Sequence, residues 1–212
     1  MRIGLNASFW QSETTGSGQY TRQLVRALNE LAPQDEGLLL LPRADRDQAP
    51  ALDAPWPVHP LGVPSALGRN MAKLCFEQVT FPRACRRLAV DVAHVPYFAP
   101  PLCPTVPTVV TIHDLIPLIL PEYRGSLAVR AYMRLVSRAA RRATLGLTDS
   151  HASARDIRRL LRIPERCLRV IYLAASKDYR PLTAEERALV LARLQMPSRY
   201  LLYLGGFDLR LK

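Results

Sequence analysis

The sequence predicts an α/β fold: a doubly wound, mostly parallel sheet of about seven strands with helices on both faces. Short apolar runs rich in Val, Ile and Leu alternate with longer amphipathic runs through most of the 212 residues. Continuous apolar strands separated by helices are typical of a parallel sheet that is covered on both faces. A glycine loop, Gly16-Ser17-Gly18, directly follows the first strand, which is where such sheets hold a phosphate.

Seven runs have the length and apolar character of strands. They are 2–7, 37–41, 58–61, 91–95, 108–113, 145–149 and 168–173. Five runs have helical periodicity. They are 18–31, 65–88, 127–143, 152–161 and 184–195. Pro82 is expected to kink or split the second of these helices, and right-handed crossovers should join the strands.

Composition is that of an ordinary globular chain, with 49% apolar and 22% charged residues. A chain of this length buries a full core and is normally one domain. Apolar runs stay below the ~18 residues of a membrane span, and the N-terminus reads as a strand, so we expect a cytoplasmic protein without a signal peptide. The four cysteines lack C-x-x-C spacing, so we expect reduced thiols and no metal.

Charge is the unusual feature, because 29 Lys and Arg outweigh 18 Asp and Glu to give +11. Residues 124–169 alone hold twelve arginines and three acids. In the helix expected at 127–143, Arg130, Arg134, Arg138 and Arg141 share one stripe. A solvated helix face explains this stripe, and so does contact with an anionic ligand or an anionic membrane surface.

Two segments predict a ligand site at the carboxyl edge of the sheet. The glycine loop offers backbone N–H groups and the positive end of a helix dipole, which suit a phosphate. His113 and Asp114 stand at the end of a later strand, on the edge where open α/β sheets bind ligands. Together these features predict a nucleotide-type ligand that meets a polar reacting group.

Six motifs, in matching order and spacing, resemble family 4 retaining glycosyltransferases. They are G-S-G-Q-Y-T-R at 16–22, E-Q at 77–78, D-V-A-H-V-P-Y at 91–97, H-D-L-I-P at 113–117, S-H-A-S-A-R-D-I at 150–157 and L-L-Y-L-G-G-F-D at 201–208. The resemblance implies a GT-B enzyme, in which two Rossmann-like domains face each other across a cleft. The N-terminal domain of such enzymes mostly binds the acceptor, and the C-terminal domain holds the nucleotide-sugar through an E-x7-E motif.

On this resemblance, residues 1–197 are the N-terminal acceptor-side domain, and 198–212 are the first strand and turn of a truncated donor-binding domain. The E-x7-E motif is missing from the sequence, so we expect this chain alone to turn over little or nothing. The family's usual Arg-Lys pair after the last motif is also altered, because Leu211 follows Arg210 and Lys212 comes one position late.

The resemblance also implies a role for each matching residue. His113 and Asp114 would be catalytic. Donor phosphate would be bound by Gly16, Ser17, Gly18 and Arg210. The acceptor would be bound by Gln19, Tyr20, His94 and Tyr97. No metal and no cofactor other than the nucleotide-sugar donor substrate is expected. Glu77 and Gln78 are interpreted as packing or acceptor-side residues, and Ser150 or Ser153 as a helix cap, with Asp156 completing a capping box.

The function that these interpretations favour is transfer of a sugar, with retention, from a nucleotide-sugar to a glycan or lipid-linked acceptor. A hexosyltransferase, with mannosyl transfer as one option, would act at the inner membrane face. A Rossmann oxidoreductase is disfavoured, since the glycine loop lacks the full G-x-G-x-x-G form and no acid ends the second strand. A basic nucleic-acid-binding domain is also disfavoured, because the arginines follow helix surfaces without an interleaved aromatic platform.

Overall fold

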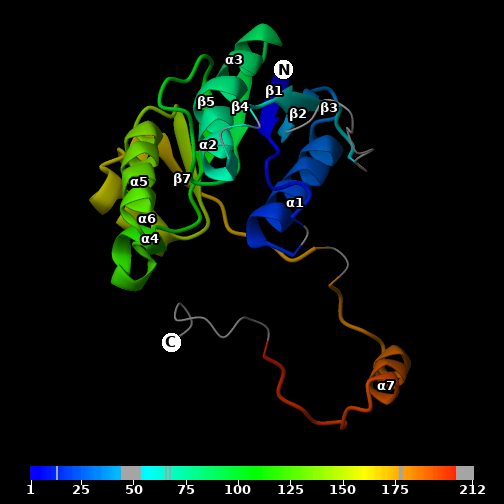
Figure 1. Cartoon of the computed structure of the whole chain (residues 1–212). Helices are drawn as coiled ribbons and strands as arrows, with labels where there is room; N and C mark the ends of the chain where they lie inside the picture. Colours follow the sequence, from blue (N-terminus) through cyan, green and yellow to red (C-terminus); the bar gives the residue numbers. More distant parts are fainter. Residues whose placement is uncertain (13, 44–53, 65, 67, 177–178, 204–212) are drawn as a thin grey trace. The chain divides into compact units, whose positions relative to one another are not determined.

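The computed structural model describes residues 1–212 except 13, 44–53, 65, 67, 177–178 and 204–212 (Figure 1). Contacts divide the chain into two units, Met1–Tyr172 and Leu173–Lys212. The candidate site lies in the first unit, and each unit is described by itself.

The first unit is built on a seven-stranded sheet in which every strand pair is parallel. The strands are β1 (Arg2–Asn6), β2 (Glu36–Arg43), β3 (Val58–Gly62), β4 (Val92–Val95), β5 (Thr108–Thr111), β6 (Leu145–Thr148) and β7 (Leu168–Val170). Their spatial order is β3-β2-β1-β4-β5-β6-β7. The predicted fold class is therefore confirmed, and the strand order reverses between β1 and β4, the point where such sheets bind ligands.

Helices cover both faces of this sheet (Figure 1). They are α1 (Gly16–Leu31), α2 (Gly68–Cys75), η2 (Phe76–Thr80), α3 (Phe81–Arg87), α4 (Ile116–Ile119), η3 (Pro121–Tyr123), α5 (Leu127–Ala140), α6 (His151–Asp156), η4 (Ile157–Leu161) and η5 (Glu165–Cys167).

Successive residues of β2 show the two faces, since side chains alternate along a strand. Leu39 packs in a core with Val25 of α1, whereas Leu38 and Leu40 pack with Phe76 and Phe81 on the opposite face. A third core joins β5 to α6 and η4 through residues that include Val110 and Ile157.

The long helix expected at 65–88 is divided into three parts. Pro82 lies in the first turn of α3, and the turn before it, η2, is a π-helix. Proline lacks the N–H that an α-helix needs at an interior position, so the wider turn accommodates it. The backbone at Cys75, Thr80 and Phe81 is helical, so the helix changes type before Pro82 without a break. The kink or split expected at Pro82 stays a prediction, and the π-helical turn was not predicted.

The second unit contains helix α7 (Ala184–Arg193). Thr183 and Glu186 form a capping box at its start. The strand expected to begin near residue 198 is not formed at 198–203, because extended backbone becomes a strand only beside a hydrogen-bonding partner. The rest of that segment lies outside the described residues, and the domain boundary at residue 197 stays a prediction.

Candidate active site at the carboxyl edge of the sheet

The glycine loop leads from β1 into α1, with Thr15 as the N-cap residue. The Thr15 Oγ1 atom accepts a hydrogen bond of 3.2 Å from the Gly18 N–H. A Cβ atom on Gly18 would overlap the Ser12 carbonyl, so this glycine lets the helix approach the preceding loop. The N–H groups of Gly16 and Ser17 have no partner among the described residues. The three donors expected for a phosphate therefore reduce to two.

His113 follows β5, and a carboxylate from the neighbouring strand orients its ring. The His113 Nδ1 atom lies 2.6 Å from the Oδ2 atom of Asp149, which follows β6. The imidazole is 26% exposed and the carboxyl group 20% exposed. A carboxylate that accepts the Nδ1–H leaves Nε2 to interact with a ligand. Nε2 is buried and has no hydrogen-bond partner in the described part of the chain.

Asp114 bonds to the backbone of the following helix. Its Oδ1 atom accepts a 3.0 Å hydrogen bond from the N–H of Ile116, at the start of α4. The acid that pairs with His113 is thus Asp149, which was not among the residues predicted from the sequence. The signal was available, because Asp149 ends the apolar run 145–149 just as His113 ends 108–113. A catalytic role for Asp114 stays a prediction.

The cap of α6 completes the surroundings of His113. Ser150 Oγ accepts from the N–H of Ser153 at 3.1 Å, so Ser150 is the cap residue. Ser153 Oγ in turn donates to the His113 carbonyl at 2.9 Å. Asp156 forms an ion pair with Arg159, so the expected capping box is not formed.

Tyr20 of α1 connects the glycine loop to His113. Its ring lies edge-on to the imidazole, with centroids 4.7 Å apart. Its hydroxyl lies 3.2 Å from the Thr111 Oγ1 atom at the end of β5. The structure therefore brings the two sequence-predicted sites, Gly16-Ser17 and His113, to one neighbourhood. Gln19 lies beside Tyr20 on the exposed side of the helix.

His94 of β4 lies beneath this group and is buried. Its Nε2 atom is 2.9 Å from Thr111 Oγ1. Burial lowers the His94 pKa to about 4, with a smaller contribution from His113, so this ring is neutral near pH 7. His94 thus positions Thr111 and, through it, Tyr20. Direct contact with an acceptor stays a prediction.

A second polar network surrounds Glu77, whose carboxylate is fully buried. Its Oε1 atom accepts from the Tyr97 hydroxyl at 3.1 Å and lies 3.2 Å from Lys73 Nζ. Its Oε2 atom accepts from the Tyr132 hydroxyl at 2.9 Å. Burial raises the Glu77 pKa, and the charge of Lys73 opposes that shift.

This network extends to the switch point between β1 and β4. The Tyr97 hydroxyl lies 3.4 Å from Ser8 Oγ, which donates to Asn6 Oδ1 at 2.7 Å. The Asn6 Nδ2 atom is buried without a partner among the described residues. Tyr97 itself is buried, so its predicted contact with an acceptor is untested and its observed role is to anchor this chain of hydrogen bonds.

The π-helix η2 supplies both Glu77 and Gln78. Gln78 donates to the Pro100 carbonyl at 3.2 Å and accepts from the Leu102 N–H at 2.8 Å. It therefore fixes the proline-rich loop that follows Tyr97. Single π-helical turns occur frequently at functional sites. Of the two roles expected for these residues, packing takes the form of polar contacts, and contact with an acceptor stays a prediction.

The described residues contain no cluster of three or more His, Cys, Asp or Glu side chains that could hold a metal. No helix in the same residues is long and apolar enough to cross a membrane. Arg210, expected to bind donor phosphate, lies outside the described residues.

The fold is that of one Rossmann-like half of a GT-B glycosyltransferase. The Glycosyltransferase Family 4 model matches residues 14–177, and the chain belongs to this family. No curated protein sequence matches the chain.

Solved structures with this fold include two glycosyltransferases. Sucrose-phosphate synthase (tll1590) from Thermosynechococcus elongatus has a TM-score of 0.63 and 14% identity, over 93% of this chain and 53% of its own. Anabaena Alr3699/HepE in complex with UDP has a TM-score of 0.56 and 16% identity, over 92% and 50%. HepE in complex with UDP-glucose has a TM-score of 0.57 and 16% identity, over 92% and 49%. The chain thus spans about half the length of these relatives.

Proposed function

We propose that this chain is the acceptor-side half of a retaining glycosyltransferase. The whole enzyme would transfer a hexosyl group, mannosyl being one option, from a nucleotide-sugar to a glycan or lipid-linked acceptor. The observation that carries the proposal is His113, whose Nδ1 is held by Asp149 while Nε2 is unpartnered, beside the start of α1. HepE, a relative in fold, has been crystallised with UDP and with UDP-glucose, which supports a nucleotide-sugar as donor.

The transfer needs hydrogen-bond donors where negative charge develops on the departing diphosphate. Gly16 and Ser17 supply two backbone N–H groups at the positive end of α1. With its proton on Nδ1, His113 would accept a hydrogen bond at Nε2 from a hydroxyl of the transferred sugar. A bond from Nε2 to a donor phosphate oxygen would need a second proton on the ring. Asp149 would keep the imidazole in the required orientation, as carboxylates do for histidines in other active sites.

The donor-binding half would supply the remaining contacts. Arg210 would act on the diphosphate, and an E-x7-E motif would hold the nucleotide. Leu201 and Leu202 are largely exposed, which is consistent with a segment that pairs with another domain. We therefore expect the 212-residue chain to bind a nucleotide-sugar weakly and to turn it over little.

A titration of the chain with UDP-glucose and with NADH, followed by amide NMR, tests the proposal. The expected result is that UDP-glucose shifts the Gly16 and Ser17 amides and the His113 ring signals, while NADH does not saturate. The variant His113→Ala should remove the ring signals and weaken UDP-glucose binding about fivefold or more, whereas Glu122→Ala, on the exposed surface, should have no effect. Tight, saturable NADH binding would instead favour an oxidoreductase.

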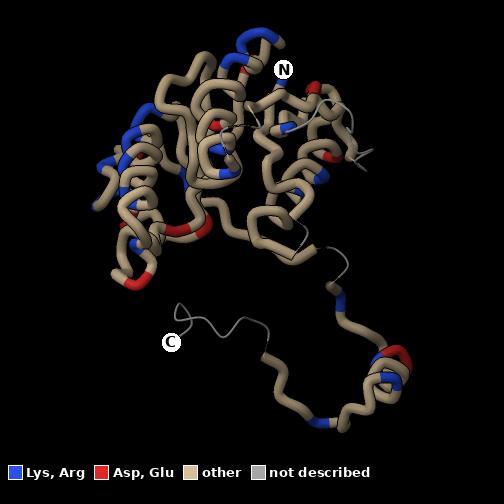
Figure 2. Tube along the Cα trace, in the orientation of Figure 1, with Lys and Arg blue, Asp and Glu red and all other residues tan. Residues whose placement is uncertain are grey.

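We also propose that the enzyme works at an anionic membrane surface, on the cytoplasmic side. A groove of about 620 Å³ beside α5 is lined by five arginines and no acid. They are Arg124, Arg130, Arg134, Arg138 and Arg141. Basic positions recur along α5 in Figure 2, and the apolar side chains of Leu127 and Val129 are exposed at its start. Exposed bases beside apolar side chains suit an anionic lipid surface.

Sedimentation with vesicles tests this part separately. Vesicles that contain phosphatidylglycerol should pull down the chain at low salt and release it at high salt, and phosphatidylcholine vesicles should not bind it. The double variant Arg134→Gln/Arg138→Gln should reduce binding about tenfold. Vesicle binding that changes neither with salt nor with these substitutions would contradict a role for the α5 groove.

A further inference from the structure

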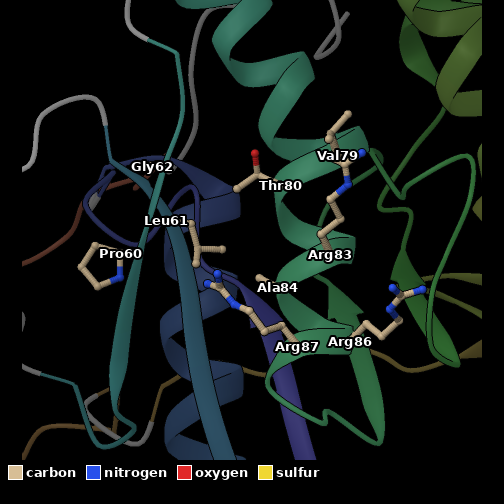
Figure 3. Close-up of a pocket in the computed structure, with 9 residues that line it drawn as sticks. All are labelled: Pro60, Leu61, Gly62, Val79, Thr80, Arg83, Ala84, Arg86 and Arg87. Atoms are coloured by element: carbon tan, nitrogen blue, oxygen red, sulfur yellow. The ribbon is translucent and has the colours of Figure 1, made fainter.

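A second basic groove lies between helix α3 and the edge strand β3. It has a volume of about 710 Å³, which is within the range of small-molecule sites. Its lining comes from β3, η2 and α3 and shares no residue with the site around His113. We call it the α3 groove (Figure 3).

The helix that forms one wall has two different faces. Ala84 and its apolar neighbours are buried, whereas Arg83, Arg86 and Arg87 are exposed. Spacings of three and four residues make Arg86 and Arg87 neighbours of Arg83 on the helix, and neighbouring like charges repel. The helix dipole favours cations in the last turn, so it accounts for Arg86 and Arg87 but not for Arg83.

Among the described residues, the groove contains no counter-charge for these arginines. None of its lining residues is acidic, and none of the three arginines has an ion pair within the described residues. Elsewhere in the described chain several arginines are paired, for example Arg159 with Asp156.

The three side chains are not equivalent in Figure 3. Arg87 extends from α3 towards Leu61 of β3 and so crosses the groove, whereas Arg86 extends to the other side of the helix. Leu61 and Ala84 are buried and form an apolar floor, and Thr80 adds a hydroxyl to the helical wall.

We propose that the α3 groove binds a ligand with a phosphate or diphosphate group, held principally by Arg87. Arg83 extends along the helix towards Val79 in Figure 3 and adds positive charge to the helical wall. Guanidinium groups match phosphate because they donate two parallel hydrogen bonds in a fixed plane. The apolar floor at Leu61 accommodates the uncharged remainder of the ligand. This site adds a second anion position to the protein, apart from the donor phosphate position proposed at Gly16 and Ser17.

The test is a titration of the full 212-residue chain with inorganic pyrophosphate, followed by amide NMR. Amides of Leu61, Gly62 and Thr80 should shift along one saturation curve. Arg87→Gln should raise the Kd of pyrophosphate on that curve about tenfold, and Arg83→Gln about fivefold. Arg86→Gln is the matched control, because it removes the same charge from the same helix and should change Kd less than twofold. Thermal melts check that each variant is folded.

Two sources of phosphate are separated by a second arm with phosphatidylglycerol vesicles. Pyrophosphate shifts without Arg87-dependent vesicle binding support a free phosphorylated ligand, and Arg87-dependent vesicle binding supports a lipid headgroup. Equal weakening by all three substitutions, or no shift at the groove amides, overturns the proposal. The Gly16 and Ser17 amides report the other anion site independently, so the two proposals can fail separately.

Discussion

Two polar networks lie at the carboxyl edge of one sheet, and they treat their ionisable groups in opposite ways. Around Glu77, both carboxylate oxygens are occupied, by Tyr97 and Lys73 on one side and by Tyr132 on the other. Around His113, one ring nitrogen is bound to Asp149 and the other has no partner among the described residues. In the first network the ionisable group itself has partners on both oxygens, although the network ends at the unpartnered Asn6 Nδ2 atom. In the second network the ionisable group has an unpartnered ring nitrogen.

This difference indicates a structural role for the Glu77 network and a ligand-binding role for the His113 network. A buried ion pair costs desolvation and stabilises little compared with apolar packing, so the Glu77 network is best understood as a means to fix geometry. It holds together η2, α5, β4 and the end of β1. His113, in contrast, has a buried Nε2 atom without a hydrogen-bond partner among the described residues. Buried polar atoms without a partner are rare in native proteins, and a binding or catalytic role is one explanation for them.

The comparison is tested most strongly by Glu77→Ala. The substitution leaves the Tyr97 and Tyr132 hydroxyls without their acceptor and opens a cavity, so the free energy of unfolding should fall by about 3 kcal/mol. Urea unfolding measures it. Glu122→Ala, at an exposed position, should stay within about 0.5 kcal/mol of the wild type. If the two variants were equally stable, Glu77 would not be a support.

The free energy of unfolding should change with pH in opposite directions for His94, in the His113 network, and for Glu77. The His94 pKa falls to about 4 in the folded protein, so the unfolded chain binds more protons between about pH 4 and its ordinary value near 6.5. Folding stability from this group therefore rises with pH through that window, by about 3 kcal/mol in total, and is lost as pH falls towards 4. The measurement is the difference in unfolding free energy between wild type and His94→Gln across this range.

Glu77 should give the opposite slope. Burial raises its pKa, so the folded protein holds the proton more tightly than the unfolded chain does. Its contribution is full below the ordinary carboxyl pKa and declines as pH rises above it. The difference in unfolding free energy between wild type and Glu77→Gln should therefore be smallest at high pH. A wild-type curve that runs parallel to that of Glu77→Gln would contradict this assignment.

The strands and helices could be predicted from the sequence because they depend on local patterns, namely apolar runs and the positions of glycines. All seven strands followed from these patterns, as did the position of the glycine loop after β1 and of His113 after β5. The pairing of His113 with Asp149 could not be read directly, because it depends on the register that sets Thr111 opposite Leu147. The burial of Glu77 depends on contacts from Tyr97 and Tyr132, 20 and 55 residues away. The strand expected after residue 198 is not formed at 198–203, and the described residues offer no strand that pairs with this segment.

Asp149→Asn tests whether Asp149 sets the tautomer of His113. An amide can still contact His113 Nδ1, but it no longer fixes which nitrogen carries the proton. We expect a loss of about 1 kcal/mol in stability, since both groups are partly exposed. The clearer effect is on the imidazole ¹⁵N shifts, which should move from one dominant tautomer to a mixture. Unchanged ¹⁵N shifts would show that Asp149 does not set the tautomer.

Tyr20→Phe should give the smallest change in stability. It tests the contact that Tyr20 makes between α1, which begins at the glycine loop, and His113. The ring contact with His113 remains, while the hydroxyl bond to Thr111 is lost. Thr111 keeps its bond to His94, so stability should fall by only about 0.5 to 1 kcal/mol. Tyr20→Ala should also free the imidazole edge and change the His113 ring signals, which Tyr20→Phe should leave in place. If both variants moved those signals equally, the hydroxyl rather than the ring would connect α1 to His113, and the orientation of the imidazole would depend on the buried Thr111–His94 pair.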